Sequence, residues 1–531
     1  MGRGQNGDDS PFCQVAALFR RGPVLNEGSA TLAQLWRRAV EAAPSNSFLR
    51  WDGPSGAVAS WTYQDFDEII AAVAKKLIGA GGTAGTAVHV CLGNSPAFIA
   101  VWLAANALGA YLVPSDPSSS THELRDHMKR SRPSVGICGA HSEELYREAS
   151  ENDFPVVVVD EGTSDLSSLM AEPIDWSEID PPSPMDPAAV LFTSGTTSSP
   201  KGVVVTQGNY AYAGRVMSAV SGLTPYDTQL VVLPLFHANA QYYSIVPAIT
   251  VAATVALVHR FSASQFVWQA ARLGATHASL FAAPIRMILN RSSPENVAVL
   301  RLRNVWFAQN LSTTEYEQIS HLLGCRPRQL YGMTETIAPV ITSDWLRDSA
   351  QTMGEVTLGG EVQLFDEHGA EPQPGDIGEI ATRGRLGDTL FAGYFDDPEA
   401  TKAAFRNDWL MTGDFAWKDA TGRFHFAGRH SERLKVSGEN VSLSEIEEIL
   451  ALHPGVLEAA AVGRPDPVRD EVPVAYVVKR DGYTNTSAAD LAEHCAKHLS
   501  KAKRPVEYHF VAALPRTSVG KIKKHQLEAL S

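Results

Sequence analysis

The segment of most chemical interest is LFTSGTTSSPKG, which runs from Leu191 to Gly202 and follows the apolar residues 188–190. A strand that opens into a loop of glycine and small hydroxyl residues can turn several N–H and O–H groups toward one anion. Pro200 stands where a Walker A loop has its second glycine, so the segment is of another type. The alternative is a Ser/Thr-rich surface loop without a ligand. The candidate anion ligands are Thr193, Ser194, Gly195, Thr196, Thr197 and, at the far end of the loop, Lys201.

Further motifs follow at wide intervals along the chain. They are TYQDF at Tyr63, PLFH ending at His237, QLYGMTE ending at Glu335, FAGY ending at Tyr394, WLMTGD ending at Asp414, AGRHSERLKVSGENV from Ala427 to Val441, and LPRTSVGK ending at Lys521. With SGTTxxPKG they resemble, in the same order, the signatures of the adenylate-forming superfamily of acyl-CoA synthetases, nonribosomal peptide adenylation domains and firefly luciferases. The resemblance covers nearly the whole chain, and so many long motifs in one order are not expected by chance.

The resemblance implies a reaction in which a carboxylate attacks the α-phosphate of ATP. Such a reaction depends on positioning the reactants and on neutralising their charge. By the same resemblance, Thr334 holds the α-phosphate and Glu335 coordinates Mg²⁺, a hard cation that prefers carboxylate and phosphate oxygens. A Thr–Glu pair on its own could instead cap a helix. The implied cofactors are therefore ATP, Mg²⁺ and, as the thiol that accepts the acyl group, CoA.

The nucleoside of ATP is expected to contact three residues of these motifs. The resemblance implies that Asp414 accepts hydrogen bonds from the two ribose hydroxyls, for which a carboxylate with two acceptor oxygens is suited. Arg429 would reach the ribose or a phosphate, and Tyr331, beside Gly332, would stack on adenine. Considered alone, the three would be a turn aspartate, a surface ion pair and a tyrosine packed in the core.

Lys521 is expected to be the catalytic lysine. In the superfamily this residue enters the site from the C-terminal domain and lowers the repulsion between the carboxylate and the α-phosphate; alone, in the basic segment GKIKK, it would be a solvated charge. By the same resemblance, the small domain is expected to rotate about a hinge two residues after Arg429, where relatives have Asp or Lys and this chain has Ser431. The resemblance implies that the segment that follows would contribute Lys435 and Gly438 to cofactor binding, the glycine allowing close approach of the pantetheine arm.

The chain departs from the superfamily pattern at positions that bear on the acid. Ala308, Gln309 and Asn310 stand where many relatives read GGAPL, so the wall beside adenine and the acyl group is more polar than usual. His237 is expected to gate the passage between acid and thiol, and further polar groups follow it. Polar groups left unpaired against a long alkyl chain would be costly, so a small polar or aromatic acid is predicted. The residues after His237 are Asn239, Gln241, Tyr242 and Tyr243.

Three functions compete on this evidence. The first is an acid–CoA ligase. The second keeps the adenylation step but transfers the acyl group to a carrier-protein thiol or an amine in trans, or activates an unusual acid. A fused carrier domain is not expected, because few residues follow Lys521. The third is an inactive nucleotide-binding homologue, against which the presence of Glu335, Asp414, Arg429 and Lys521 argues.

These motifs need a scaffold, and the hydrophobic pattern predicts one of the α/β class. Short β-branched runs alternate with helical stretches, which implies mostly parallel sheets. We expect a large N-terminal domain over 1–430, with two α/β layers and a glycine-rich β subdomain, and a small mobile α+β domain over 431–531. A helix is expected over 61–80. The expected strands are 87–92, 135–138, 156–160, 229–233, 253–258, 304–307, 457–462 and 472–479, and the expected C-terminal helices are 444–452 and 488–499.

Composition limits the remaining possibilities. The net charge of −14 disfavours nonspecific binding to nucleic acid or to an anionic membrane. The apolar stretch from Phe98 to Val113 is too short to span a membrane and is expected to be a buried helix. The first ten residues do not read as a secretory signal. Five dispersed cysteines without a CxxC pair fit a reducing, cytoplasmic location, and the oligomeric state is not readable.

Overall fold

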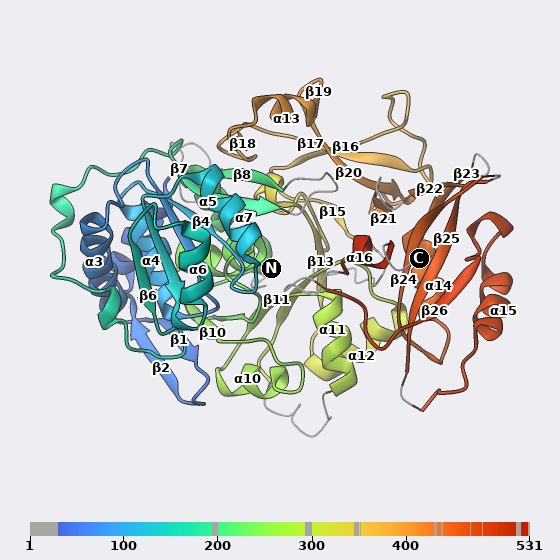
Figure 1. The fold of residues 1–531 in the computed structure, drawn as a ribbon, viewed down its shortest axis with the longest axis horizontal. Coiled ribbons are helices and arrows are strands. Elements are labelled where there is room, and N and C mark those ends of the chain that lie inside the picture. The colour runs from blue at the N-terminus through green and yellow to red at the C-terminus, as the bar shows by residue number, and fades with distance from the viewer. Residues whose placement is uncertain are drawn as a thin grey trace, which may run out of the picture.

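The structure is a computed structural model that describes residues 30–193, 200–291, 300–344, 350, 352–429, 433–436, 439–467, 469–480, 482–516 and 522–528. One sheet runs in the order β15-β14-β13-β12-β11-β9-β10-β1-β2 (Figure 1). Its strands from β13 to β1 are parallel. At the edges, β14 is antiparallel to β13, β15 to β14, and β2 to β1. The strands are β1 (Ser47–Asp52), β2 (Val58–Thr62), β9 (Thr228–Val231), β10 (Thr254–Val258), β11 (His277–Phe281), β12 (Asn304–Ala308), β13 (Arg328–Tyr331), β14 (Ile341–Thr342) and β15 (Glu355–Val356).

A second sheet runs in the order β18-β8-β7-β4-β3-β5-β6. From β7 to β6 its strands are parallel, and β7 and β8 form an antiparallel hairpin in which Thr193 pairs with Lys201. The loop of the hairpin thus spans the predicted anion-binding segment. The strands are β3 (Ala87–Cys91), β4 (Tyr111–Pro114), β5 (Val135–Gly139), β6 (Val156–Val159), β7 (Pro187–Thr193), β8 (Lys201–Thr206) and β18 (Gly393–Tyr394).

One continuous apolar core contains buried residues of both sheets and of the helices between them in sequence. The helix α4 is buried on every side over Pro96–Asn106, as expected for a helix without a polar face. Ser95 caps it and Pro96 occupies its first turn. The helices of this part are α2 (Leu32–Ala42), α3 (Tyr63–Gly79), α4 (Pro96–Ala107), α5 (Thr121–Ser131), α6 (Glu143–Ser150), α7 (Gln207–Ser221), α8 (Ala238–Ala240), α9 (Val246–Thr250), α10 (Phe266–Arg272), α11 (Ala282–Arg291) and α12 (Thr313–Leu323), with a π-helical turn at Gln241–Ile245.

Asn106 and Gln207 place buried amides inside this core. Gln207 Nε2 donates to the backbone and side-chain oxygens of Asn106 at 3.0 and 3.1 Å, and its Oε1 accepts from the Leu32 N–H at 3.1 Å. Asn106 Nδ2 donates to the Ala188 carbonyl at 3.2 Å. Gln207, the first residue of α7, therefore connects α2 and α4 inside the core.

Two expected elements need correction at their ends. The stretch from Phe98 to Val113 is not one helix, because α4 ends at Ala107 and the chain turns through Gly109, at a φ of +73°, into β4. The helix expected over 61–80 begins at Tyr63, because Thr62 forms a capping box with Asp65 and leaves Trp61 in β2.

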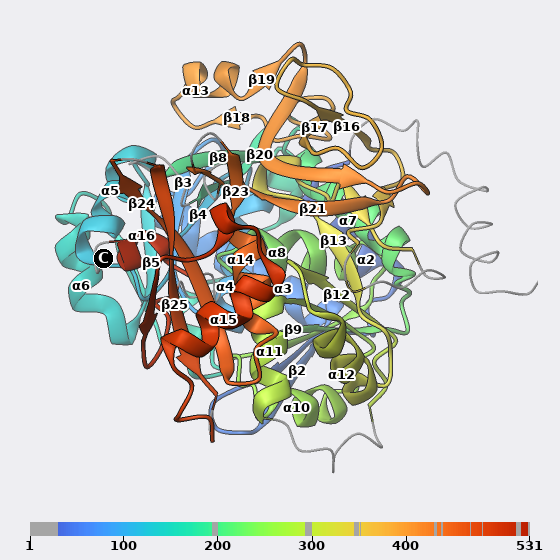
Figure 2. The ribbon, with the colours of Figure 1, turned by 90° about the vertical axis from the view of Figure 1, so that its right-hand side faces the viewer.

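Two smaller units follow the sheets along the chain (Figures 1 and 2). The β subdomain pairs β16-β17-β20-β19 with β21 beside β20, and the C-terminal sheet pairs β23-β22-β25-β24 with β26 beside β25. The apolar residues of the C-terminal unit form clusters separate from the large core. Those of the β subdomain share a cluster with Tyr331 and Ile341 of the first sheet, and Leu410 of β20 belongs to the large core. The elements are β16 (Glu361–Phe365), β17 (Gly378–Arg383), α13 (Pro398–Ala403), β19 (Phe405–Arg406), β20 (Trp409–Lys418), β21 (Phe424–Arg429), β22 (Arg433–Val436), β23 (Glu439–Ser442), α14 (Leu443–Ala451), β24 (Val456–Asp466), β25 (Asp470–Lys479), α15 (Ala488–His498), β26 (Glu507–Phe510) and α16 (Lys524–Glu528).

The predicted fold class is confirmed. A large α/β part with two sheets and a β subdomain precedes a small α+β unit, and the expected strands and helices occur within a few residues of their predicted ends. Among the residues that the structure describes, no helix has the length and apolar character that crossing a membrane requires.

Candidate functional site

The hairpin of β7 and β8 brings the two ends of the predicted anion loop together. Thr193 Oγ1 donates a long hydrogen bond of 3.4 Å to the Lys201 carbonyl. Lys201 Nζ lies 4.7 Å from the ring centroid of Tyr394, which belongs to the neighbouring strand β18. A cation over an aromatic face is attracted by the ring. Tyr394 therefore orients the positive charge at the exit of the loop.

Glu335 occupies a buried position beside this lysine and tyrosine. It lies with Thr334 in a single 3-10 turn, Thr334–Thr336, and is 6% exposed. Its Oε1 accepts a hydrogen bond of 2.9 Å from the Tyr394 hydroxyl, and its carbonyl accepts one of 2.9 Å from the Phe391 N–H. Burial raises the pKa of the Glu335 carboxyl, and the hydrogen bond from Tyr394 and the charges of Lys201 and Arg429 oppose that rise.

The turn that carries Glu335 is strained. Ile337 follows it with φ +64° and ψ −73°, a conformation that a β-branched residue rarely adopts, and its side chain is fully buried. The hydroxyl of Thr336 braces the turn by accepting from the Met333 N–H at 3.0 Å. The surrounding packing thus fixes the position of Thr334 and Glu335.

Asp414 and Arg429 face each other across the pair of strands β20 and β21. Arg429 Nε lies 2.7 Å from Asp414 Oδ1, and the Tyr331 hydroxyl donates to Asp414 Oδ2 at 2.7 Å. Asp414 is 2% exposed. Burial, and then the charge of Asp414, raise the pKa of Tyr331, so its phenol stays protonated as a donor. Three residues from separate motifs therefore form one connected group.

The polar wall predicted at the end of β12 exists, but another residue organises it. Gln309 has a φ of +76°, and Gln329 Nε2 donates to the Gln309 carbonyl at 3.1 Å and to Asn310 Oδ1 at 3.2 Å. Asn310 Nδ2 donates to Glu448 Oε1 of α14 at 3.1 Å. This wall, which includes Ala308, therefore contacts the C-terminal unit directly.

The residues after His237 differ in what they can offer a ligand. The interpretation of Gln241 as a ligand group is wrong: its Nε2 donates to the Leu235 carbonyl at 2.7 Å and its Oε1 accepts from the Tyr210 hydroxyl. By contrast, the Tyr242 hydroxyl and Asn239 Oδ1 are buried without a hydrogen-bond partner among the described residues. Tyr243 points its hydroxyl at Gly332, where a Cβ would lie 2.8 Å away.

Several predicted site residues lie outside the described part of the chain. They are Ser194, Gly195, Thr196, Thr197, Gly438 and Lys521, as is the hinge residue Ser431, and for Lys435 only the backbone, in β22, is described. Sequence reasoning missed the contacts of two residues that it had quoted. Tyr394 ends the FAGY motif and Gln329 begins QLYGMTE. Their positions in these motifs were the signal that could have indicated that they belong to the site.

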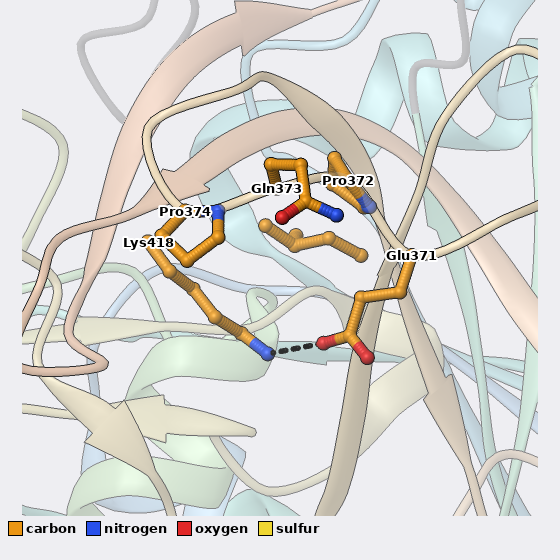
Figure 3. Close-up of a pocket in the computed structure, with 6 residues that line it drawn as sticks. Glu371, Pro372, Gln373, Pro374 and Lys418 are labelled. Atoms are coloured by element: carbon orange, nitrogen blue, oxygen red, sulfur yellow. Dashed lines mark hydrogen bonds and ion pairs between the residues drawn. The ribbon is translucent and has the colours of Figure 1, made fainter.

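Two pockets lie away from these residues. One, of about 310 Å³, lies in the β subdomain, and Lys418 Nζ is 3.2 Å from Glu371 Oε1 in its lining. Figure 3 shows these side chains with their ion pair. The other, of about 360 Å³, is lined by residues after β5, β6 and β10, among them His141, Glu161 and His259. Neither shares a residue with the group around Glu335 and Asp414. Among the described residues, no group of three or more His, Cys, Asp or Glu is arranged to hold a metal ion.

Comparison with known proteins is consistent with this geometry. The model of the AMP-binding enzyme family matches residues 36–395, and that of the AMP-binding enzyme C-terminal domain matches residues 445–521. A crotonobetaine/carnitine–CoA ligase of Salmonella arizonae is 33% identical, over 94% of this chain and 99% of its own.

Solved structures agree with these matches. ATP-bound MatB from Rhodopseudomonas palustris is 25% identical and superposes with a TM-score of 0.83, over 94% of this chain and 98% of its own. The apo form of MatB, with the same identity and coverage, superposes with a TM-score of 0.73. The o-succinylbenzoate CoA synthetase of Bacillus subtilis, in complex with its acyl-adenylate intermediate, is 26% identical with a TM-score of 0.81, over 93% and 97% of the two chains.

Proposed function

This chain belongs to the AMP-binding enzyme family, and on that premise we propose that it activates a small polar or aromatic acid with Mg-ATP and transfers it to CoA. Formation of an acyl adenylate followed by transfer to CoA is the class of reaction that the family and the named relatives support. The acid, the residues that handle it and the binding of Mg²⁺ are the proposed part.

The arrangement around Glu335 is the observation that carries the proposal. A buried carboxylate lies within hydrogen-bonding distance of Tyr394, whose ring holds Lys201 at the end of the hairpin loop. We assign the phosphates of ATP to this loop, with Thr334 at the α-phosphate. We assign the ribose to Asp414 and Arg429, and adenine to the wall formed by Tyr331 and residues 308–310.

The residues present fit a magnesium ion that arrives with ATP. Mg²⁺ is usually bound through one or two carboxylates together with substrate phosphates and water, not by a cage of protein ligands. Glu335 supplies one such carboxylate, and burial strengthens its interaction with a cation. Bound there, the ion would neutralise phosphate charge, and Glu335 and Lys201 would orient the phosphates around it.

The chemistry then has two steps. A carboxylate oxygen of the acid bonds to the α-phosphorus while the bond from that phosphorus to the bridging oxygen breaks, and pyrophosphate leaves with the electron pair. The thiolate of CoA next bonds to the acyl carbon, and AMP leaves. We assign to Lys521 the role of reducing the repulsion between the carboxylate and the α-phosphate in the first step. A mobile domain that begins at residue 431 would bring Lys521 to the site and withdraw it before the second step.

The acid is assigned to the region between His237 and Gly332. A buried hydroxyl or amide oxygen without a partner costs free energy that a polar ligand can recover. Tyr242 and Asn239 offer such atoms, and Tyr243 closes the space next to Gly332. These contacts favour a compact acid with a polar group over a long alkyl chain.

The test is acid-dependent release of pyrophosphate. Purified protein is incubated with Mg-ATP and with carnitine, crotonobetaine, o-succinylbenzoate, benzoate or palmitate, with and without CoA, and products are identified by mass spectrometry. We expect an acyl-CoA product with a small acid and its loss in Lys521→Ala. Preference for palmitate would contradict the assignment of the acid, pyrophosphate without a CoA adduct would point to another acceptor, and equal activity in Lys521→Ala would contradict the role of that lysine.

A further inference from the structure

Helix α5 packs against the hairpin of β7 and β8 through Phe192, the residue before Thr193. The ring of His127 stacks on Phe192 with centroids 4.2 Å apart and planes inclined by 6°. One turn further along α5, the guanidinium carbon of Arg130 lies 4.8 Å from the same ring centroid. Both contacts reach the strand that leads into the proposed phosphate loop.

Arg130 also contacts the strand that leaves the loop. Its Nη1 donates a hydrogen bond of 2.6 Å to the carbonyl of Pro200, which directly precedes Lys201. A hydrogen bond from a charged donor is stronger than one between neutral groups. Asp126, one turn earlier on α5, lies 3.5 Å from the same nitrogen. A single side chain on α5 therefore contacts both ends of the loop.

The ring of His127 is also fixed by a chain of hydrogen bonds. His127 Nδ1 lies 2.8 Å from Ser115 Oγ, which is 3.0 Å from His89 Nε2, and His89 Nδ1 is 2.7 Å from the Tyr146 hydroxyl. Burial lowers the pKa of His127 to about 4, so a neutral imidazole makes the stack. Such a hydrogen-bonded chain restricts the rotation of both histidines.

The opposite strand leaves space for the Phe192 ring. Gly202 pairs with Phe192 across the hairpin, and a Cβ at Gly202 would lie 3.2 Å from Phe192 Cε1 and 2.9 Å from Val190 Cγ1. The glycine therefore lets the ring lie across β8. The loop end of the hairpin is thus held by the packing of Phe192 and by the hydrogen bond from Arg130 to Pro200.

We infer that Arg130 and His127 are positioning residues that hold Phe192 and Pro200, on either side of the proposed phosphate loop, at a fixed separation and thereby favour the binding of Mg-ATP. The inference rests on the proposed function, because that function assigns the phosphates to this loop. Neither residue needs to contact ATP, and both act through Phe192 and Pro200. Preorganisation of this kind increases affinity by reducing the entropy lost on binding.

The test compares two arginines of the same helix. Arg130→Ala removes the contacts to Phe192 and Pro200, whereas Arg125→Ala removes ion pairs with Glu148 and Glu151. Mg-ATP binding is measured by calorimetry in the full-length protein without acid, and thermal stability is recorded for each variant. We expect Arg130→Ala to raise the Kd for Mg-ATP about tenfold, equivalent to about 1.4 kcal/mol. Arg125→Ala should leave that Kd within about twofold of wild type, and Arg130→Lys, which keeps the charge but not the planar group, should fall between them.

The outcomes separate this inference from the proposed function. Equal Kd values for wild type and Arg130→Ala, or equal increases in both alanine variants, would overturn the inference. A selective increase in Arg130→Ala supports it even if none of the acids is turned over, in which case the proposed substrate class fails alone. A wild-type protein that does not bind Mg-ATP would overturn both.

Discussion

Burial raises the pKa of Glu335 and the hydrogen bond from the Tyr394 hydroxyl opposes that rise. The change Tyr394→Phe removes the hydroxyl and keeps the ring that contacts Lys201. A hydrogen bond to a charged, buried group contributes about 1.5–3 kcal/mol. One pH unit corresponds to about 1.4 kcal/mol. Loss of this hydrogen bond should therefore shift the acid limb of the pH profile of kcat/KM for Mg-ATP to higher pH by about one to two pH units. This profile reports ionisations of the free enzyme.

Stability provides a second measure of the same change. Burial raises the pKa of Glu335 in the folded protein above its unfolded value, so the folded state holds the proton more tightly. The contribution of this group is therefore favourable below the unfolded pKa and is lost as the pH rises through the folded pKa. In Tyr394→Phe the folded pKa of Glu335 should be higher still, so its contribution to stability should persist to a higher pH. Urea unfolding at a series of pH values would measure this change.

A matched variant removes a tyrosine hydroxyl elsewhere. Tyr63 is fully buried and its hydroxyl donates to the Ala253 carbonyl at 2.7 Å. Tyr63→Phe should lose about 1–3 kcal/mol of stability and leave the acid limb in place. If the acid limb of folded Tyr394→Phe coincides with that of wild type, Glu335 is not the ionising group or the hydrogen bond does not influence it, and the reasoning fails.

Two further predictions follow from contacts in the site. Glu448→Ala removes the hydrogen bond to Asn310, by which the C-terminal unit contacts the wall at residues 308–310. It should slow adenylate formation, measured by ATP–pyrophosphate exchange, about two- to tenfold, as for an exposed pair worth about 0.5–1.4 kcal/mol. Thioester formation from a supplied acyl adenylate should not change, and equal slowing of both steps would contradict our assignment of this contact to the adenylation step. Tyr242→Phe removes a buried hydroxyl without a partner among the described residues and should leave thermal stability unchanged or higher by up to about 1 kcal/mol, while lowering kcat/KM for the acid; an unchanged kcat/KM would remove Tyr242 from the acid pocket.

The fold was predictable because its elements carry local signals. The strand that ends at Thr193 contains a short apolar run, and α3 begins at Tyr63, directly after the capping residue Thr62. The errors arise where tertiary contacts override composition. The apolar stretch after Phe98 contains both a helix and a strand, and only the turn at Gly109 separates them.

The site was predictable as a set of motifs but not as a set of contacts. Motif order indicated Glu335, Asp414 and Arg429, yet sequence spacing cannot place Tyr394 against Glu335, because the two lie 59 positions apart and belong to different sheets: Tyr394 is in β18, which pairs with β8, and Glu335 follows β13. It also misassigned Gln241, whose amide satisfies a backbone carbonyl and a tyrosine inside the core. The residues assigned to the loop 194–197 and Lys521 stay predictions.

The amides of Asn106 and Gln207 have a consequence for how this protein can diverge. Each satisfies groups of the other inside a core that also contains the start of α2. Replacing one alone leaves buried polar atoms of the other unpaired, whereas replacing both with apolar residues avoids that loss but still removes the acceptor of the Leu32 N–H. The effects of the two substitutions are therefore not additive. Their identities should change together among descendants of this sequence, and a lineage that alters only one should pass through a less stable intermediate.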